Sequence, residues 1–200
     1  MLIVVRHGRT EANASGLLLG RLDPGLDELG RRQADALAAV VAGAERVVCS
    51  PLRRTRETAA ALGLPVEVDE RWIELDYGVL DGTPLRDVPS DLWSRWVADT
   101  EFAPDGGESI AALGQRVRSA CDDLAAEAAE RDIVVVTHVS PVKAAVGWAL
   151  GVGDEVAWRL FVAPASVTRV ATGGPRRSLH AFNVVSHLDG LASPAAAPGD

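Results

Sequence analysis

Leu2-Ile3-Val4-Val5-Arg6-His7-Gly8 opens the chain, and this stretch decides how the rest of the sequence is interpreted. Its four apolar residues predict a short buried strand, and Arg6 and His7 follow that strand without a gap. A guanidinium is a permanent cation, and an imidazole can act as a nucleophile or as an acid and base. Because ligands of open α/β sheets bind at the carboxyl ends of the strands, the stretch suits a phosphate site. An Arg-His pair can equally cap a strand, so the remaining sequence has to decide between the two interpretations.

The bulk composition narrows the class of protein. The chain has 200 residues, 48% of them hydrophobic and 24% charged, which is ordinary for one soluble globular domain. Its net charge of -8 argues against binding to nucleic acid or to a membrane surface, since both partners require a basic face. A site for an anion must therefore be a local cluster of cations. These cations are arginines with one exception, Lys143.

The cysteines and the apolar runs predict a cytoplasmic protein. Cys49 ends an apolar strand and Cys121 lies in a helical pattern, so both are interpreted as core residues and not as a disulfide framework. The N-terminal apolar run is too short for a signal peptide, and no apolar run approaches the length of a membrane span.

Strand and helix patterns alternate along the chain, which predicts a three-layer α/β/α sandwich with a mostly parallel central sheet and helices on both faces. We expect residues 1–188 to form one domain and residues 189–200, with their Ala/Pro/Gly-rich end, to be a disordered tail. The predicted strands are residues 2–5, 47–49, 66–68, 133–137, 167–171 and 179–182. The predicted helices are residues 28–42 behind Asp27, 51–62 behind Ser50 as N-cap, 110–130 behind Ser109, and 141–150.

Several residues that suit phosphate chemistry follow the predicted strands. Arg6 and His7 follow the first strand, and His138 follows the apolar run 133–137. Ser50-Pro51-Leu52-Arg53-Arg54 follows the strand 47–49 and opens a helix. Glu74 lies in the less regular segment that comes after the strand 66–68. Because three of these positions are strand-to-helix junctions, we expect them at the same edge of the sheet, where helix N-termini favour an anion.

Taken in order and at this spacing, the motifs resemble the histidine phosphatase superfamily, in its phosphoglycerate-mutase-like branch, over roughly residues 2–188. The Ser-Pro-Leu-x-Arg motif places the phosphate-binding arginine at Arg54 and not at Arg53. The matching motifs are Arg6-His7-Gly8 with Thr10 and Asn13, Gly20-Arg21-Leu22-Asp23-Pro24, Ser50-Pro51-Leu52-Arg53-Arg54, Glu74 with Gly78 and Gly82, Gly106-Gly107-Glu108-Ser109, and His138.

The resemblance implies covalent catalysis at nitrogen, without a metal or another cofactor. His7 would attack the phosphorus of a phosphomonoester, and Glu74 would donate a proton to the leaving oxygen. Around the phosphoryl oxygens the resemblance places Arg6, Arg54 and His138. It also implies substrate contacts at Asn13, Gly20 and Val139.

Each of these residues has a structural alternative. Glu74 can be an ordinary surface carboxylate with Asp76 as a rival, and His138 can be a core histidine. The tryptophans at 72, 93 and 96 are more typical of a core than of a pocket, although the segment after Gly82 can also form a wall of the substrate site. The sequence also departs from the family pattern, because Val139 stands where a glycine is usual. Leu17 and Leu19 should make the leaving-group side of the site more apolar.

The sequence therefore favours a phosphatase that hydrolyses small phosphorylated metabolites. A phosphoglycerate mutase using the same phosphohistidine is the nearest alternative, but the short segment between Gly82 and Gly106 argues against it. A non-catalytic binder on the same fold would normally have lost His7 or Glu74, and both are present. A monomer and a homodimer are both compatible with the sequence.

Overall fold

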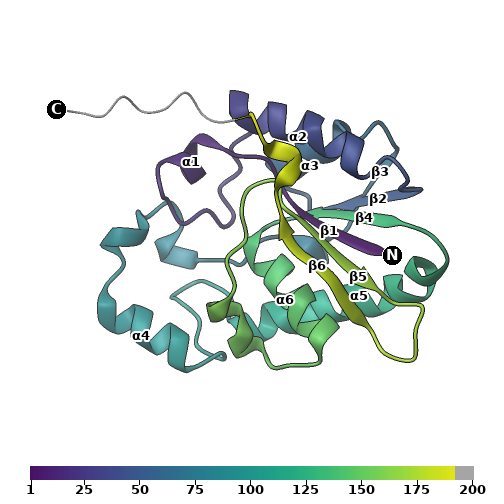
Figure 1. Ribbon diagram of the computed structural model, residues 1–200. Coiled ribbons are helices and arrows are strands. Elements are labelled where there is room, and N and C mark those ends of the chain that lie inside the picture. Colours follow the sequence, from purple (N-terminus) through teal and green to yellow (C-terminus); the bar gives the residue numbers. More distant parts are fainter. Residues whose placement is uncertain (192–200) are drawn as a thin grey trace.

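A six-stranded sheet forms the centre of the computed structural model, which describes residues 1–191 (Figure 1). The strand order is β3-β2-β4-β1-β5-β6. β1 pairs in parallel with β4, and β2 pairs in parallel with both β3 and β4, whereas β5 and β6 add an antiparallel edge. The strands are β1 (Leu2–Arg6), β2 (Arg46–Cys49), β3 (Val66–Val68), β4 (Ile133–Thr137), β5 (Val167–Ala171) and β6 (Ser178–Val184). The predicted mostly parallel sheet is confirmed.

Helices cover both faces of the sheet, as the alternation of elements predicts (Figure 1). Side chains alternate between the two faces along each strand, so Val4 and Val135 pack with α5 and α6, while Val5 and Val136 pack with α2 and α3. The helices are α1 (Glu11–Ala14), α2 (Glu28–Val40), α3 (Arg53–Ala60), α4 (Ser90–Ala98), α5 (Ile110–Glu130) and α6 (Val139–Leu150). The remaining short helices have 3-10 geometry.

Two of the predicted helix starts are confirmed and two are not. The side chains of Asp27 and Ser109 accept backbone N–H groups at the starts of α2 and α5. The expectation for Ser50 is wrong, because α3 begins at Arg53 with Leu52 at its N-cap and without a side-chain cap. The Ser50 hydroxyl instead contacts a histidine, described below. α6 begins at Val139, before the predicted residue 141, because proline is compatible with the first turn of a helix.

The register of the sheet brings the predicted site together. Arg6 lies opposite Thr137 in the parallel pair of β1 and β4, so His7 and His138 leave adjacent strands at the same edge. β2 ends at this edge as well, with Cys49 opposite Val136. The parallel register is therefore what converts three distant sequence motifs into neighbours.

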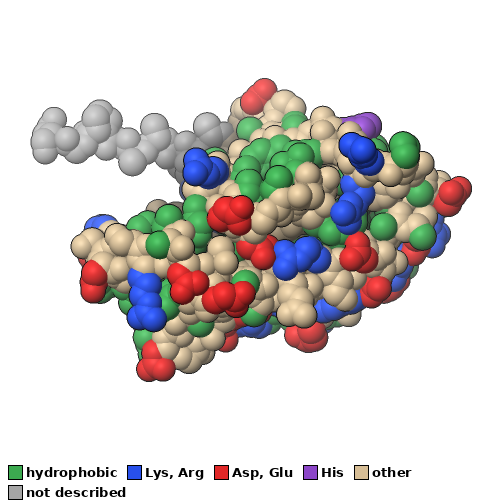
Figure 2. All heavy atoms as spheres, turned by 90° about the horizontal axis from the view of Figure 1, so that it is seen from below, with side chains coloured by type: hydrophobic (Ala, Val, Ile, Leu, Met, Phe, Trp, Pro, Cys, Tyr) green, Lys and Arg blue, Asp and Glu red, His purple; other side chains and the backbone are tan. Residues whose placement is uncertain are grey.

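The surface and the termini add three observations. Seen from below, acidic and basic side chains are mixed with a group of hydrophobic ones, and this face shows no continuous basic area among its described side chains (Figure 2). Within residues 1–191, no helix is long and apolar enough to cross a membrane. The expected disordered tail lies outside the described residues from position 192 onward.

Gly8 and Gly30 allow the loop that follows β1 to lie close to the first turn of α2. An added Cβ at Gly30, in the first turn of α2, would clash with the carbonyl oxygen of Arg9, and one at Gly8 would clash with the carbonyl oxygen of Gly30. We predict that Gly30→Ala lowers the free energy of unfolding by about 1–3 kcal/mol, because the backbones must separate to relieve the overlap. Urea denaturation measures this change. The matched control is Gly43→Ala, since a Cβ there meets nothing within 4 Å; equal stability losses in the two variants would contradict the explanation.

Candidate active site

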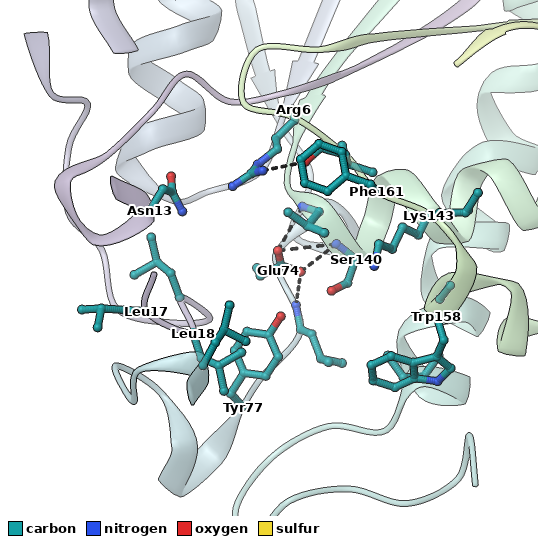
Figure 3. Close-up of a pocket in the computed structure, with 18 of the residues that line it drawn as sticks. Arg6, Asn13, Leu17, Leu18, Glu74, Tyr77, Ser140, Lys143, Trp158 and Phe161 are labelled. Atoms are coloured by element: carbon teal, nitrogen blue, oxygen red, sulfur yellow. Dashed lines mark hydrogen bonds between the residues drawn. The ribbon is translucent and has the colours of Figure 1, made fainter. Parts of the chain in front are cut away.

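A cavity of about 460 Å³ opens at the edge of the sheet where β1, β2 and β4 end. Its polar part is formed by Arg6, His7, Asn13 and Glu74, together with the start of α6 (Figure 3). Apolar side chains line the rest of the cavity. They include Leu17, Leu18, Leu19, Leu85, Trp93, Trp96, Trp158, Leu160, Phe161 and Val162.

His7 is held as a neutral imidazole with one available nitrogen. Its ring is only 2% exposed, and its Nδ1 lies 2.7 Å from the carbonyl oxygen of Gly8. Because a carbonyl oxygen can only accept, Nδ1 carries the proton and Nε2 carries the lone pair. Burial lowers the pKa of His7 well below its usual range, and the charges of Arg54 and Arg6 lower it further. The arrangement fits a nucleophile that is unprotonated near neutral pH.

His138 has the same charge state but is fixed on both sides. Arg54 donates from Nε to His138 Nδ1 at 3.2 Å, so the ring proton must lie on Nε2. Nε2 then donates to the Ser50 hydroxyl oxygen at 2.7 Å. Burial, followed by the charge of Arg54, lowers the pKa of His138 well below its usual range. The ring lies against His7, with their centroids 5.1 Å apart.

Arg54 is fully buried, and backbone carbonyls satisfy its guanidinium. Nη1 donates to the carbonyl oxygen of Leu22 at 2.7 Å and Nη2 to that of Gly20 at 2.9 Å. Asp81 holds this loop in place, because its carboxylate accepts the N–H groups of Gly20, Arg21 and Leu22, each at 2.8 Å. Gly20 thus positions the arginine through its carbonyl, whereas its predicted contact with substrate stays a prediction.

Arg6 points at the cavity with part of its guanidinium unused. It is 8% exposed, and Nη1 donates to the carbonyl oxygen of Val162 at 2.7 Å. Its buried Nε has no hydrogen-bond partner within the described part of the chain. Burial lowers the pKa of Arg6 to about 10, with a smaller contribution from Arg54 and an opposing one from Glu74. Arg6 therefore stays charged at neutral pH, next to space that an anion can occupy.

Glu74 sits at the N-terminus of α6. Its Oε2 accepts the N–H of Val139 at 3.0 Å, and its Oε1 accepts those of Leu75 at 2.7 Å and Ser140 at 3.2 Å (Figure 3). A helix N-terminus favours a negative group, and the side chain is only 3% exposed. The surface alternative for Glu74 is thus wrong. The Val139 N–H is bonded to Glu74 here, and its contact with a phosphate stays a prediction.

The structure brings the predicted catalytic residues together, although not all at the cavity surface. Arg54 and His138 lie behind His7, while Arg6, His7 and Glu74 line the cavity. Arg53 points outward and pairs with Glu57 at 2.6 Å, in agreement with the choice of Arg54 for the site.

Asn13 also lies at the cavity. Its Oδ1 accepts from the Thr10 hydroxyl at 3.0 Å and from the Thr10 N–H at 3.2 Å. Because these contacts use the oxygen, the side-chain NH₂ group remains to face a ligand.

Sequence reasoning missed several residues that shape the site. The sequence predicts a helix cap at Ser50, and it gives no signal for Asp81. Tyr77 is half-buried beside the cavity, where desolvation and the charge of Glu74 raise the pKa of its phenol. Trp93 and Trp96 line the cavity, so the segment after Gly82 does form part of its wall, while Trp72 and Trp96 also belong to the core. The sequence alone left both positions open for Trp93, because a large apolar ring can fill a core or line a pocket wall.

Fold and site together define a class of α/β protein in which imidazoles and guanidiniums meet at the carboxyl ends of parallel strands. The sequence profile of the histidine phosphatase superfamily (branch 1) matches residues 2–185. The chain belongs to this superfamily, so the resemblance noted in its motifs is confirmed.

Relatives of the chain carry phosphatase names. Phosphoserine phosphatase 1 of Hydrogenobacter thermophilus is 33% identical over 94% of this chain and 93% of its own length. A solved mycobacterial glucosyl-3-phosphoglycerate phosphatase, described as a complex with VO3, has a TM-score of 0.82 and 31% identity, covering 92% of this chain and 99% of that one. A protein of Mycobacterium tuberculosis named as bifunctional is 37% identical over 84% of this chain. The chain spans about half the length of that protein and of two similar mycobacterial relatives.

The two neutral, buried histidines predict that the protein loses stability in mild acid. Their folded pKa values lie below the unfolded value of about 6.5, so the unfolded chain takes up protons first as the pH falls. Between pH 7.5 and pH 5.5 we expect each histidine to remove about 1.4 kcal/mol from the free energy of unfolding.

Urea titration at both pH values measures this loss in the native protein and in His138→Gln, which should lose about 1.4 kcal/mol less. The control is His180→Gln, because His180 is exposed. A pH dependence that is the same in His138→Gln and the native protein would show that the buried ring does not remain neutral.

Proposed function

We propose that the chain hydrolyses small phosphomonoesters through a phosphohistidine on His7. The observation that carries this proposal is the neutral His7 ring, whose Nε2 is available, next to Arg6 and beside the Glu74 carboxylate in one cavity. Arg54 and His138 complete the positive and polar surroundings from behind. Such surroundings stabilise the charge that develops on phosphoryl oxygens during transfer.

In the first step, His7 Nε2 forms a bond to phosphorus while the bond from phosphorus to the ester oxygen breaks. The leaving oxygen needs a proton, and Glu74 is the carboxyl group at the cavity that can deliver it. A monoanionic phosphomonoester brings that proton into the site, so Glu74 can pass it on without a net change in its own charge. The products of this step are a free alcohol and a phosphorylated His7.

In the second step, a water molecule attacks phosphorus and the bond between phosphorus and Nε2 breaks. Glu74, which is ionised again, accepts the proton of this water. Glu74 passes this proton to the phosphate, which leaves as the monoanion, and His7 returns to its neutral state with the proton still on Nδ1. The hydrogen bond from Nδ1 to the Gly8 carbonyl keeps the ring in this orientation through both steps.

The relatives support a phosphatase that acts on a small metabolite. Their names specify phosphoserine and glucosyl-3-phosphoglycerate as substrates, which are both phosphomonoesters. We infer the same class of reaction for this chain, with the ester itself to be identified by a panel of phosphorylated metabolites. We further propose that the protein is cytoplasmic and that its reaction needs no metal ion.

We predict different effects on turnover for substitutions of His7 and of Glu74. His7→Ala should abolish phosphate release and the acid-labile labelling of the protein by a phosphorylated substrate, because no nitrogen is left to form the intermediate. Glu74→Gln should lower kcat by roughly 10²–10⁴-fold, since it removes the proton donor. Phosphate release and labelling with ³²P measure both effects. The control is Arg53→Gln, outside the site, which should retain activity; turnover by His7→Ala would refute the proposed nucleophile.

The same assay can separate a phosphatase from a mutase. With 3-phosphoglycerate as substrate, a phosphatase releases inorganic phosphate, whereas a mutase returns the phosphoryl group to a hydroxyl and forms 2-phosphoglycerate. We expect phosphate. Formation of 2-phosphoglycerate as the main product would favour the alternative function.

A further inference from the structure

The cavity has two chemically different halves. Arg6, His7 and Glu74 occupy one, and the other is bounded by aromatic and aliphatic side chains. Trp93, Trp96 and Trp158 contact one another edge to face, with ring centroids 5.6–6.0 Å apart. This packing makes a rigid apolar wall next to the proposed phosphoryl site.

Part of this wall is exposed at the cavity mouth. Phe161 is 73% exposed and Trp93 is 38% exposed, although both line the cavity. Large apolar side chains that line a concave site and face water are typical of ligand contacts. We therefore expect the alcohol part of the ester to lie against them.

Lys143 is the one cation of this half. It is the single lysine of the chain, it is half-buried, and it reaches into the cavity from α6 on the same side as Trp158 (Figure 3). Within residues 1–191 its ammonium group forms no hydrogen bond or ion pair, and it interacts with Glu74 and Arg6 only through their charges. An unpaired ammonium group at a cavity needs an anionic partner or water.

We propose that Lys143 binds a carboxylate on the alcohol part of the substrate, whose apolar portion packs against Trp93, Trp158 and Phe161. This inference rests on the proposed phosphatase function and names its substrate class: hydrophobic phosphomonoesters that carry a carboxylate. The anionic group is a carboxylate and not a second phosphate for reasons of charge. One ammonium group balances one negative charge, and the nearby Glu74 would repel a dianion more strongly.

The partial burial of Lys143 also favours the binding of an anion next to its ammonium group. Desolvation lowers the pKa of its ammonium group; the charge of Glu74 opposes this shift in part, and the charge of Arg6 adds a smaller effect in the direction of desolvation. A bound carboxylate reverses both effects, because it replaces the lost water and supplies the opposite charge. The lysine is thus stabilised by the ligand that it selects.

Binding of phosphonates tests the proposal without turnover. Calorimetry compares benzylphosphonate with meta- and para-carboxybenzylphosphonate, in the native protein and in Lys143→Met. We expect at least one carboxylated ligand to bind the native protein about tenfold more tightly than benzylphosphonate, and this preference to vanish in Lys143→Met. Lys143→Arg should retain most of it. Arg159→Met is the matched control, because it removes an exposed cation that lies next to Trp158 but outside the cavity lining.

Any result other than this lysine-dependent preference would contradict the proposal. Equal affinities of the native protein for all ligands would show that no carboxylate is recognised, and so would a failure of every phosphonate to bind. If Lys143→Met weakened all ligands equally, the lysine would act on the phosphoryl group or on folding. Release of phosphate from phenyl phosphate is measured in parallel, since its absence beside a lysine-dependent preference would refute the phosphatase function alone.

Discussion

The burial of the Arg54 guanidinium is the constraint on which the rest of the site depends. A charge that is removed from water is tolerated only when its donors are satisfied. Arg54 meets this requirement with carbonyls of the loop around Gly20 and with the imidazole of His138. Asp81 in turn fixes that loop. One side chain therefore connects α3, the loop before α2, and the junction of β4 with α6. Burial lowers the pKa values of both imidazoles, and the charge of Arg54 lowers them further.

Glu74 provides the second connection and the only carboxylate of the described cavity lining. It receives backbone N–H groups at the start of α6, so the segment after β3 is tied to the same junction that presents His138. The cations outnumber this carboxylate, and the site as a whole therefore attracts an anion even though the protein is acidic. The tryptophans line the other half of the same cavity, so its polar and apolar side chains are spatially separate.

Much of this arrangement could be predicted from residue patterns. The β-branched run 133–137 predicted a buried strand, and Asp27 and Ser109 predicted the starts of two helices; the structure confirms all three. Ser50 shows the limit of such reasoning. A serine followed by proline suits a helix start locally, but its hydroxyl contacts a histidine 88 positions away, and no local pattern records that contact.

By itself, the sequence determined the alternation of strands and helices, the family, and the identity of the residues that meet at the edge of the sheet, because periodicity and motif spacing are local properties of the chain. Only the tertiary structure decided which tautomer His7 and His138 adopt, that Glu74 lies at a helix N-terminus, and that tryptophans of the irregular segment face a cavity. These features depend on hydrogen-bond partners and on packing between segments that are remote in sequence, and their geometry exists only once the parallel register of β1 and β4 is formed.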